Sequence, residues 1–349
     1  MSAHVEPSAA AQAEAGARGS GAAETGAADT GAANTGAADT GAGTQVAYLG
    51  PDGTFTAEAA AALVPDAELI AHETIPEVFA AVRAGRVDHG VVPIENMIEG
   101  SVNVTLDELT FGPPGLYIRQ EVVRRVRLHL LGHEGTRLDQ VRVLRSQPVA
   151  LAQCRQWVAA HLDHPHEEAE TSTAEAARLV ARADPAAGEA AVAPRLAAQR
   201  FGLAVLAEDV HDVAENTTRF AVLGTSMAAR TGADKTSLVV FFGDDRPGLL
   251  LKVLEEFALR GINLTKIESR PAKTTLGEYC ILIDCEGHPT EARIAEALRS
   301  VHRHVAEVRV LGAYPRADGA PPGVHPADSD GAYAEASAWH ARLLDDVDP

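Results

Sequence analysis

The chain has 349 residues, more than one compact core usually organises, so we expect two domains with appended tails. Its formal net charge of −19 argues against a nucleic-acid surface, which needs clustered Lys and Arg. The three cysteines lack zinc-like or paired redox spacing, which indicates a reducing compartment. No apolar run approaches the roughly 20 residues of a membrane helix, and no signal-peptide pattern is present. We therefore expect a cytoplasmic protein without membrane contact.

The two ends of the chain differ from its middle in composition. Residues 1–44 are mainly Ala, Gly, Thr and acidic residues and contain the internal repeat TGAADTGAANTGAADTGAG. Such a segment buries too little to offset its ordering entropy, which predicts a disordered tail. Residues 315–349 are predicted to form a second, acidic and flexible tail. Within it, Trp339, Leu343 and Leu344 could form a short docking helix.

Between residues 45 and 228, short apolar runs alternate with helical patterns. The runs lie at 45–49, near Leu69, and at 90–94, 141–144 and 190–193; the helices start at Thr54, span 75–84, 149–160 and 173–183, and start again at Pro194. This alternation predicts α/β layering with buried, largely parallel strands. Residues 117–131 are expected to be extended and to cross between two α/β lobes. A cleft between lobes suits a small ligand.

Residues 236–314 follow a different plan, βαββαβ. The predicted strands are 237–242, 264–269, 279–284 and 305–311, and the predicted helices are 247–260 and 290–301. Pro247 suits the start of the first helix and Gly261 suits its end. This order predicts a small ferredoxin-like domain.

Three polar segments carry candidate chemistry, two of them after predicted strands and the third before the apolar run 221–223. The glycine loop 50–56 precedes a helix, where glycines allow a close approach to a ligand and free amides suit an anion. Glu95 and Asn96 come directly after a buried strand and should point into the crevice. Residues 216–220 (Asn-Thr-Thr-Arg-Phe) offer hydroxyls, a carboxamide and a guanidinium suited to a carboxylate. Each segment alone also fits an ordinary turn, strand end or surface loop.

Together these segments resemble the prephenate dehydratase family. The matching pieces occur in family order: the glycine loop with Phe55, the Val-Pro-Ile-Glu-Asn run continuing to Thr105 and Asp107, the stretch 148–154, the turn 172–174, and Thr218-Arg219-Phe220. The resemblance covers residues 46–223. The rest of the folded chain resembles an ACT regulatory domain through residues 248–250, 261–265 and 267–271. The implied fold is a two-lobed catalytic domain like a periplasmic binding protein, at 45–228, followed by the ACT domain at 236–314.

The resemblance implies decarboxylating dehydration of prephenate to phenylpyruvate in phenylalanine biosynthesis, without a metal or organic cofactor. Thr218 would give a hydrogen bond or relay a proton to the leaving hydroxyl, Arg219 would pair with a substrate carboxylate or hold the loop, and Phe220 would wall the ring. Asn96 would donate a hydrogen bond. Glu95 ranks as a structural hydrogen-bonding group ahead of a catalytic acid. The implied substrate-binding residues are Thr54, Phe55, Ser101, Thr173 and Asn216.

The resemblance also implies phenylalanine as an allosteric effector of a homodimer or homotetramer. Its pocket would lie at a subunit interface, where the turns before Pro247 and at 261–263 meet. The implied effector residues are Gly248, Leu249, Leu250, Asn263, Leu264, Glu268, Ser269 and Arg270. A domain that only dimerises is the alternative.

The chain departs from the family pattern at three positions. Met97 stands where serine is usual, so the contact expected of that serine is missing or is supplied by a neighbour such as Ser101. Gln147 replaces histidine, and Leu249 replaces alanine in the effector loop. Arogenate as substrate and a catalytically silent amino-acid sensor stay open as alternatives. An exported solute-binding protein would need an export signal, and a chorismate mutase fusion is disfavoured by the repeats before Val46.

Overall fold

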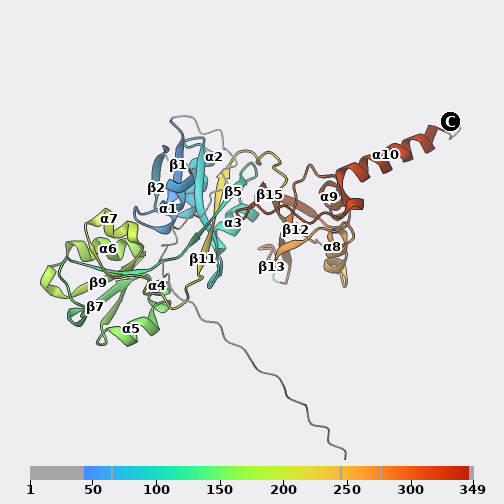
Figure 1. Cartoon of the computed structure of the whole chain (residues 1–349). Coiled ribbons are helices and arrows are strands. Elements are labelled where there is room, and N and C mark those ends of the chain that lie inside the picture. Colours follow the sequence, from blue (N-terminus) through green and yellow to red (C-terminus); the bar gives the residue numbers. More distant parts are fainter. Residues whose placement is uncertain (1–42, 64–65, 244–245, 276, 346–349) are drawn as a thin grey trace, which may run out of the picture. The chain divides into compact units, whose positions relative to one another are not determined.

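The computed structural model describes residues 43–63, 66–243, 246–275 and 277–345 (Figure 1). The predicted disordered tail lies almost wholly outside these residues. The described chain forms two α/β lobes, a C-terminal domain at residues 234–315 and a final helix. None of the described helices is long and apolar enough to cross a membrane.

Lobe 1 is an α/β layer with a mixed sheet. Its strands are β1 (Gln45–Leu49), β2 (Glu68–His72), β3 (His89–Asn96), β4 (Gly100–Ser101), β5 (Tyr117–Arg125) and β11 (Thr217–Gly224), and its helices are α1 (Phe55–Leu63), α2 (Ile75–Arg83) and α3 (Asn103–Phe111). β1 pairs in parallel with β2 and β3, as predicted. β11 lies between β3 and β5 and runs antiparallel to both, so the prediction of largely parallel strands is wrong for this part of the sheet.

Lobe 2 is a second α/β layer. Its strands are β6 (His129–Gly132), β7 (Val143–Ser146), β8 (His166–Ala169), β9 (Glu189–Ala193) and β10 (Ala204–Ala207), and its helices are α4 (Pro148–Ala152), α5 (Arg155–His161), α6 (Thr173–Arg182) and α7 (Arg195–Phe201). The helix predicted at 149–160 is therefore two helices. The carboxylate of Asp212 caps the second one, accepting from the backbone N–H groups of Gln156 and Trp157, both at 3.1 Å.

Two extended segments join the lobes. β5 belongs to the sheet of lobe 1 and the following β6 to that of lobe 2, which confirms the predicted crossing. The chain returns from β10 to β11 beside it. The two crossings are hydrogen-bonded to each other, because Val126 N–H donates to Asn216 O at 2.8 Å and Val210 N–H donates to Leu128 O at 2.8 Å.

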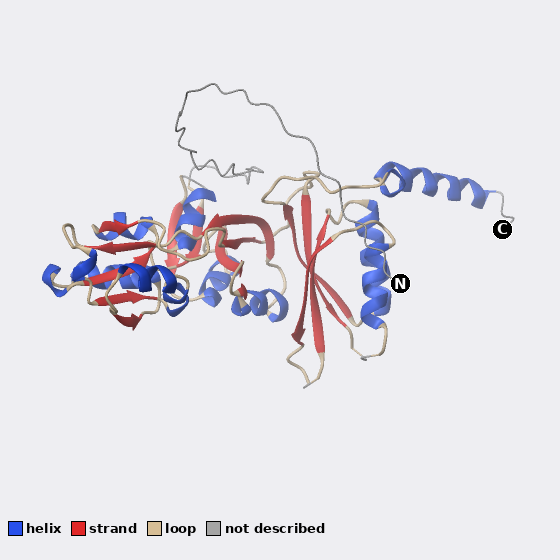
Figure 2. Cartoon of the chain, turned by 60° about the horizontal axis from the view of Figure 1, so that its bottom comes forward, coloured by secondary structure: helices blue, strands red, loops and turns tan. Residues whose placement is uncertain are grey.

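The C-terminal domain has the predicted βαββαβ order. Its elements are β12 (Asp234–Phe241), α8 (Leu249–Ala258), β13 (Leu264–Pro271), β14 (Tyr279–Glu286), α9 (Ala292–His304) and β15 (Glu307–Pro315), with strand order β13-β14-β12-β15. Figure 2 shows the helices of this domain on one side of its strands. Alternate residues of β12 face opposite ways. Leu238 and Val240 belong to the core that also holds residues of α8 and α9, whereas Val239 belongs to the core shared with lobe 1.

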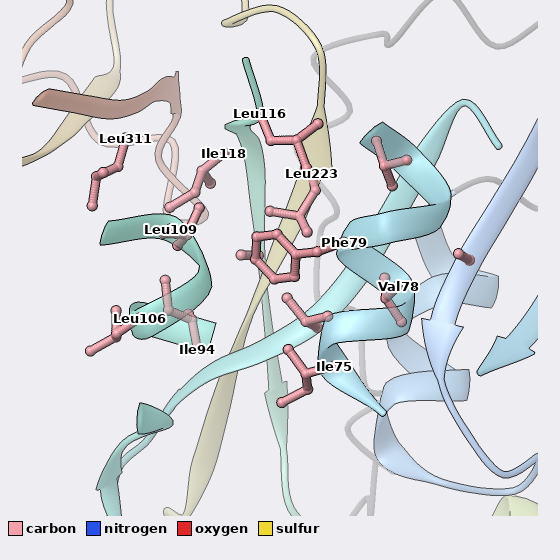
Figure 3. Packing of buried hydrophobic residues seen from close by; sticks show 14 of the residues in the cluster. Ile75, Val78, Phe79, Ile94, Leu106, Leu109, Leu116, Ile118, Leu223 and Leu311 are labelled. Atoms are coloured by element: carbon pink, nitrogen blue, oxygen red, sulfur yellow. The ribbon is translucent and has the colours of Figure 1, made fainter. Parts of the chain in front are cut away.

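The sheets of lobe 1 and the C-terminal domain meet edge to edge. β15 pairs in parallel with β5 where Gly312 lies opposite Ile118. A Cβ at Gly312 would lie 2.3 Å from the Ile118 carbonyl oxygen, so only glycine permits this approach. Leu311 then packs in one core with Leu106 and Leu109 of α3 (Figure 3). Lobe 1 and the C-terminal domain are therefore joined by buried apolar contacts and not only by the linking segment.

The C-terminal segment differs from the expected flexible tail. Residues Asp330–Asp345 form helix α10, whose start is fixed because Asp330 accepts from Ala292 N–H at 2.8 Å and from Arg230 at 2.6 Å. The helix buries none of its described residues, and Trp339 is 57% exposed. The helix considered for this segment is present, and Trp339, Leu343 and Leu344 on it are exposed.

Candidate active site

A cavity of about 450 Å³ lies between the lobes. Lobe 1 contributes the start of α1 and the ends of β3 and β11, and lobe 2 contributes the starts of α4 and α6. Six of the residues predicted for the site line it: Thr54, Phe55, Asn96, Thr173, Thr218 and Phe220. Asn216 is 1% exposed and hydrogen-bonds to two lining residues, Asn96 and Gln153.

A β-bulge on β3 decides which side chains face the cavity. Thr218 lies opposite Asn96 and Arg219 opposite Glu95, but Phe220 lies opposite Pro93, so Ile94 is an extra residue. Pro93 and Asn96 both line the cavity as a result. Strict alternation from Pro93 would have turned Glu95 inward instead.

The side-chain amide of Asn96 orients the Thr218 hydroxyl. Asn96 Oδ1 accepts from the backbone N–H groups of Ile98 and Glu99 at 3.0 and 3.1 Å. These two bonds fix which end of the amide is oxygen. Asn96 Nδ2 therefore donates to Thr218 Oγ1, at 2.9 Å. Because Thr218 is the acceptor in this bond, its own hydroxyl hydrogen can be donated to a ligand in the cavity.

Hydrogen bonds from Asn96 also fix the orientations of the Asn216 and Gln153 side-chain amides, the second of which belongs to lobe 2. Asn96 Nδ2 also donates to Asn216 Oδ1 at 3.0 Å, and Asn216 Nδ2 donates to Gln153 Oε1 at 3.0 Å. Gln153 lines the cavity, and its Nε2 group remains available as a donor. We call this set of hydrogen-bonded side chains the amide relay; it consists of Asn96, Asn216, Gln153 and Thr218.

Two helix N-termini line the cavity. α1 begins at Phe55 after Thr54, whose Oγ1 accepts from Ala57 N–H at 3.2 Å. α6 begins at Thr173 after Ser172, whose Oγ accepts from Glu175 N–H at 3.0 Å. First-turn N–H groups have no intrahelical partner and lie at the positive end of the helix dipole, so they favour an anion.

The charged residues among those that line the cavity are both carboxylates, Glu73 and Glu99, and both are exposed. Anion recognition here therefore depends on neutral donors. Sequence reasoning missed Gln147 and Gln153 as site residues, although both stand in or beside the stretch that carried the resemblance. Met97 is 57% exposed and does not line this cavity.

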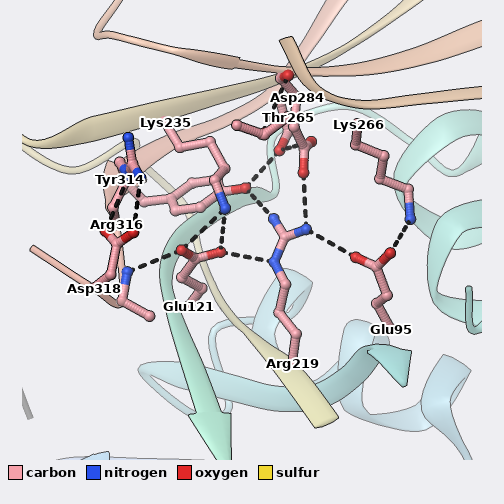
Figure 4. A network of polar contacts seen from close by, with 12 residues as sticks. Glu95, Glu121, Arg219, Lys235, Thr265, Lys266, Asp284, Tyr314, Arg316 and Asp318 are labelled. Carbon is pink, nitrogen blue, oxygen red and sulfur yellow. Dashed lines mark hydrogen bonds and ion pairs between the residues drawn. The ribbon is translucent and has the colours of Figure 1, made fainter. Parts of the chain in front are cut away.

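Arg219 does not fit the role of substrate clamp (Figure 4). Its side chain leaves the opposite face of β11, where Nη1 donates to Asp284 Oδ2 at 2.8 Å and Nη2 to Tyr314 Oη at 2.6 Å. Nε lies 2.7 Å from Glu121 Oε2. Burial alone would lower the pKa of Arg219, but Tyr314, Asp284 and Glu121 raise it above its ordinary value. In this geometry Arg219 binds protein groups, which fits the structural alternative expected for it and not the pairing with a substrate carboxylate.

Glu95 lies on the same face as Arg219, with its carboxylate 3.3 Å from Arg219 Nη1 and 3.2 Å from Lys266 Nζ. The structural role ranked first for Glu95 agrees with this position. Ser101 also faces the C-terminal domain, hydrogen-bonding to Glu268 at 2.5 Å and to Lys266 at 2.6 Å. Its expected substrate contact is therefore wrong in this geometry.

The loop glycine Gly53 has a different role from the one expected. Its φ is 85°, and an added Cβ would lie 3.2 Å from Ala197 Cα of α7. The close approach it permits is therefore between the lobes and not to a ligand.

The predicted effector residues fall into two groups. Gly248 (φ 86°) precedes α8, with Leu249 buried and Leu250 41% exposed, while Asn263 directly precedes β13 and Leu264 begins it. Ser269 is exposed on the same strand. Glu268 and Arg270 instead contact lobe 1, where Arg270 donates to Asn103 and Asp107, each at 2.7 Å. They do not fit an effector pocket with the other six.

Within the described ranges, no group of three or more His, Cys, Asp or Glu side chains could hold a metal ion.

Comparison with known proteins matches both parts of the chain. A family model described as prephenate dehydratase matches residues 46–228, and one described as ACT domain matches residues 236–303. The prephenate dehydratase of Mycobacterium tuberculosis is 45% identical over 311 residues, covering 86% of this chain and 94% of that protein.

Solved structures give the same assignment. The crystal structure of prephenate dehydratase from Arthrobacter aurescens in complex with L-Phe has a TM-score of 0.81 and 40% identity, covering 86% of this chain and 100% of that chain. A structure of GqqA, described as a novel type of quorum quenching acylase, has a TM-score of 0.70 and 30% identity, covering 78% of this chain and 97% of that chain. With both domains matched in order, the chain belongs to the prephenate dehydratase family and carries a C-terminal ACT domain.

Proposed function

We propose that the cavity between the lobes is where this chain converts prephenate into phenylpyruvate. The ring carboxylate leaves as carbon dioxide, and its electron pair enters the ring. The ring C–O bond breaks, and the oxygen leaves with a proton as water. The site must therefore hold a dianion, assist the departing oxygen and exclude bulk water.

The direction of the Thr218 hydroxyl carries this proposal. Because Thr218 Oγ1 accepts from Asn96 at 2.9 Å, its hydrogen is free for the leaving oxygen. A threonine hydroxyl is too weak an acid to give up its proton outright. We infer that it stabilises the departing oxygen by a hydrogen bond, or relays a proton from a bound water.

Neutral donors would bind the two substrate carboxylates. The N-termini of α1 and α6 offer backbone N–H groups, and Gln153 Nε2 is oriented as a donor by Asn216. Phe220 and Pro93 would pack against the substrate ring, since both line the cavity beside Thr218 and Asn96. Groups held in place before the substrate arrives lose little by reorganising during the reaction.

Arogenate is the second candidate substrate. It carries an ammonium group where prephenate has a keto group, and the charged residues lining the cavity are the carboxylates Glu73 and Glu99. A carboxylate favours an ammonium nearby. The names of the relatives favour prephenate.

Separate turnover of the two substrates tests the assignment. Purified chain should form phenylpyruvate from prephenate, followed by absorbance, or phenylalanine from arogenate, followed by chromatography. Glu73→Gln and Glu99→Gln should lower any arogenate turnover relative to prephenate turnover. No turnover of either substrate would contradict the proposed function and favour the silent sensor.

We also propose that phenylalanine binds the C-terminal domain between the Gly248 and Asn263 turns and inhibits the enzyme. The A. aurescens relative was solved with L-Phe, and the ACT model matches this part of the chain. The apolar side chain of Leu250, 41% exposed, is suited to pairing with a second subunit, so we expect at least a homodimer. A cytoplasmic location remains our prediction.

Calorimetry tests the effector site. Phenylalanine should bind wild type and bind Asn263→Ala more weakly, because the carboxamide would be lost from the pocket. Glu268→Gln should bind phenylalanine as wild type does, because Glu268 contacts Ser101 of lobe 1, and it therefore separates the two groups of effector residues. Absence of phenylalanine binding to wild type would leave a domain that only dimerises.

A further inference from the structure

The charged groups that link the C-terminal domain to lobe 1 meet on the far face of the two strands that carry Thr218 and Asn96 (Figure 4). Arg219 of β11 bonds to Asp284 of β14 and Tyr314 of β15. Glu95 of β3 pairs with Lys266 of β13 at 3.2 Å. Arg219 and Glu95 also pair with each other across the strands.

This group, which we call the charge network, is balanced and largely buried. Its cations are Arg219, Lys235 and Lys266, and its carboxylates are Glu95, Glu121 and Asp284. Removing one partner from a buried set leaves an uncompensated charge, which is strongly unfavourable. The charge network therefore holds its members in one arrangement or moves them together.

The strand register links the charge network to the chemistry. The cross-strand pair Arg219–Glu95 directly adjoins the cross-strand pair Thr218–Asn96. The first pair faces the C-terminal domain and the second faces the cavity. A shift of Arg219 and Glu95 would displace the backbone of their neighbours Thr218 and Asn96. The hydrogen bond from Asn96 that orients the Thr218 hydroxyl would change with it.

The proposed effector site reaches the charge network along one strand. Asn263 precedes β13, and Lys266 lies three residues further on, 3.2 Å from Glu95. We propose that Arg219 and Glu95 are positioning residues that transmit the state of the C-terminal domain to Thr218 and Asn96, with Lys266 as the contact that moves them. This inference rests on the proposed regulation by phenylalanine.

The chain contains its own control for this inference. Lys273 also crosses from the C-terminal domain to lobe 1, with Nζ 2.6 Å from Asp107 Oδ2. Its partner lies on α3 and not on β3 or β11. Lys273 therefore joins the same two parts of the molecule without contacting the strands of the cavity.

The experiment compares Lys266→Met, Lys266→Arg and Lys273→Met in the full chain. Prephenate turnover is measured against phenylalanine concentration, and phenylalanine binding is measured by calorimetry. Lys266→Met should need about fivefold or more phenylalanine for half inhibition, or lose inhibition, while still binding it. Lys266→Arg should restore the response, and Lys273→Met should behave as wild type.

The outcomes separate this inference from the proposed regulation. If wild type neither binds phenylalanine nor is inhibited, the regulation fails and the inference fails with it. If Lys266→Met binds phenylalanine and is inhibited as wild type is, or if Lys273→Met loses inhibition equally, only the transmission route is overturned. Should Lys266→Met not fold, Ser101→Ala removes the hydroxyl that joins Lys266 and Glu268. An unchanged half-inhibiting concentration in Ser101→Ala would then overturn the route.

Discussion

The two faces of β11 are built from opposite chemistries. Toward the cavity, Thr218 belongs to the amide relay, whose hydrogen bonds join uncharged groups. Toward the C-terminal domain, Arg219 belongs to the charge network. The active face thus fixes the direction of donors without fixed charge, and the supporting face supplies stiffness through charges that need one another.

This contrast separates two kinds of loss. Changes on the cavity face should lower turnover and leave the fold intact, because the groups there are few and partly solvated. Changes on the far face should lower stability, because they leave buried charges without partners. Substitutions at adjacent residues of β11 should therefore be detected by different measurements, turnover on the cavity face and stability on the far face.

The largest expected effect is on turnover. Thr218→Ala should lower kcat about 10²–10⁴-fold with little change in KM, because the hydroxyl acts most on the departing oxygen. Thr218→Ser should keep much of the activity. Thr217→Ala, the same change one residue earlier, should be near wild type. A raised KM with unchanged kcat would assign Thr218 to binding alone.

Arg219→Leu should mainly lower stability. Asp284 would lose its ion-pair partner in a buried setting and Glu121 would keep only Lys235, and we expect a loss of about 3–5 kcal/mol in the free energy of unfolding. Urea unfolding measures it. Arg137→Leu is the control, because its ion pair with Asp139 is exposed and the unfolding midpoint should not change. Equal midpoints in the two variants would contradict the charge network's role.

Asn96→Asp tests the amide relay without changing its shape. An aspartate can still accept from Ile98 and Glu99 N–H but cannot donate to Thr218. The Thr218 hydroxyl would then turn toward the new carboxylate, and kcat should fall about tenfold or more. Asn103→Asp, the same change on α3, should leave turnover unchanged. Full activity of Asn96→Asp would show that Thr218 needs no such orientation.

Acid should weaken the charge network. Burial alone raises the pKa of Asp284, but the Arg219 charge and the Ser237 hydrogen bond outweigh it and lower the pKa. A carboxyl with a lowered folded-state pKa adds stability above its unfolded pKa of about 3.9, and this is lost as pH falls through the folded value. Thermal midpoints measured below about pH 4 should fall faster for wild type than for Asp284→Asn. Parallel curves would contradict this.

The smallest expected effect concerns α10. Removing residues 331–349 keeps Asp330, and the described part of the helix buries no residue. The melting temperature should change by less than about 2 °C and turnover should not change. A larger fall would show that the helix docks in solution.

Sequence patterns predicted the elements better than their orientations. The strand at 45–49, the βαββαβ order and the strand crossing between lobes were all predicted, because apolar runs and helix-end residues are local signals. The opposite directions of Thr218 and Arg219 were also readable, since a strand alternates. Interpreted as one polar motif, however, the two residues predict a common site, although alternation along a strand separates their side chains.

Other features had no local signal. The bulge at Ile94 turns Glu95 away from the cavity, and nothing in the run 92–96 marks it. The break at Gln153 and Cys154 depends on Asp212, some 60 residues further along the chain. Ser101 contacts a strand of another domain. Such outcomes depend on tertiary contacts that a single sequence does not display.

The paired crossings between the lobes form a hinge. Two connections that run side by side permit rotation about their common line and resist sliding. Asn216 lies in this hinge and joins Gln153 of lobe 2 to Asn96 of lobe 1. Opening the lobes would stretch the Asn216–Gln153 bond, and hydrogen bonds weaken steeply with distance and angle. A rotation of the lobes would therefore misalign the donors of the site, so that catalytic competence depends on the angle between the lobes.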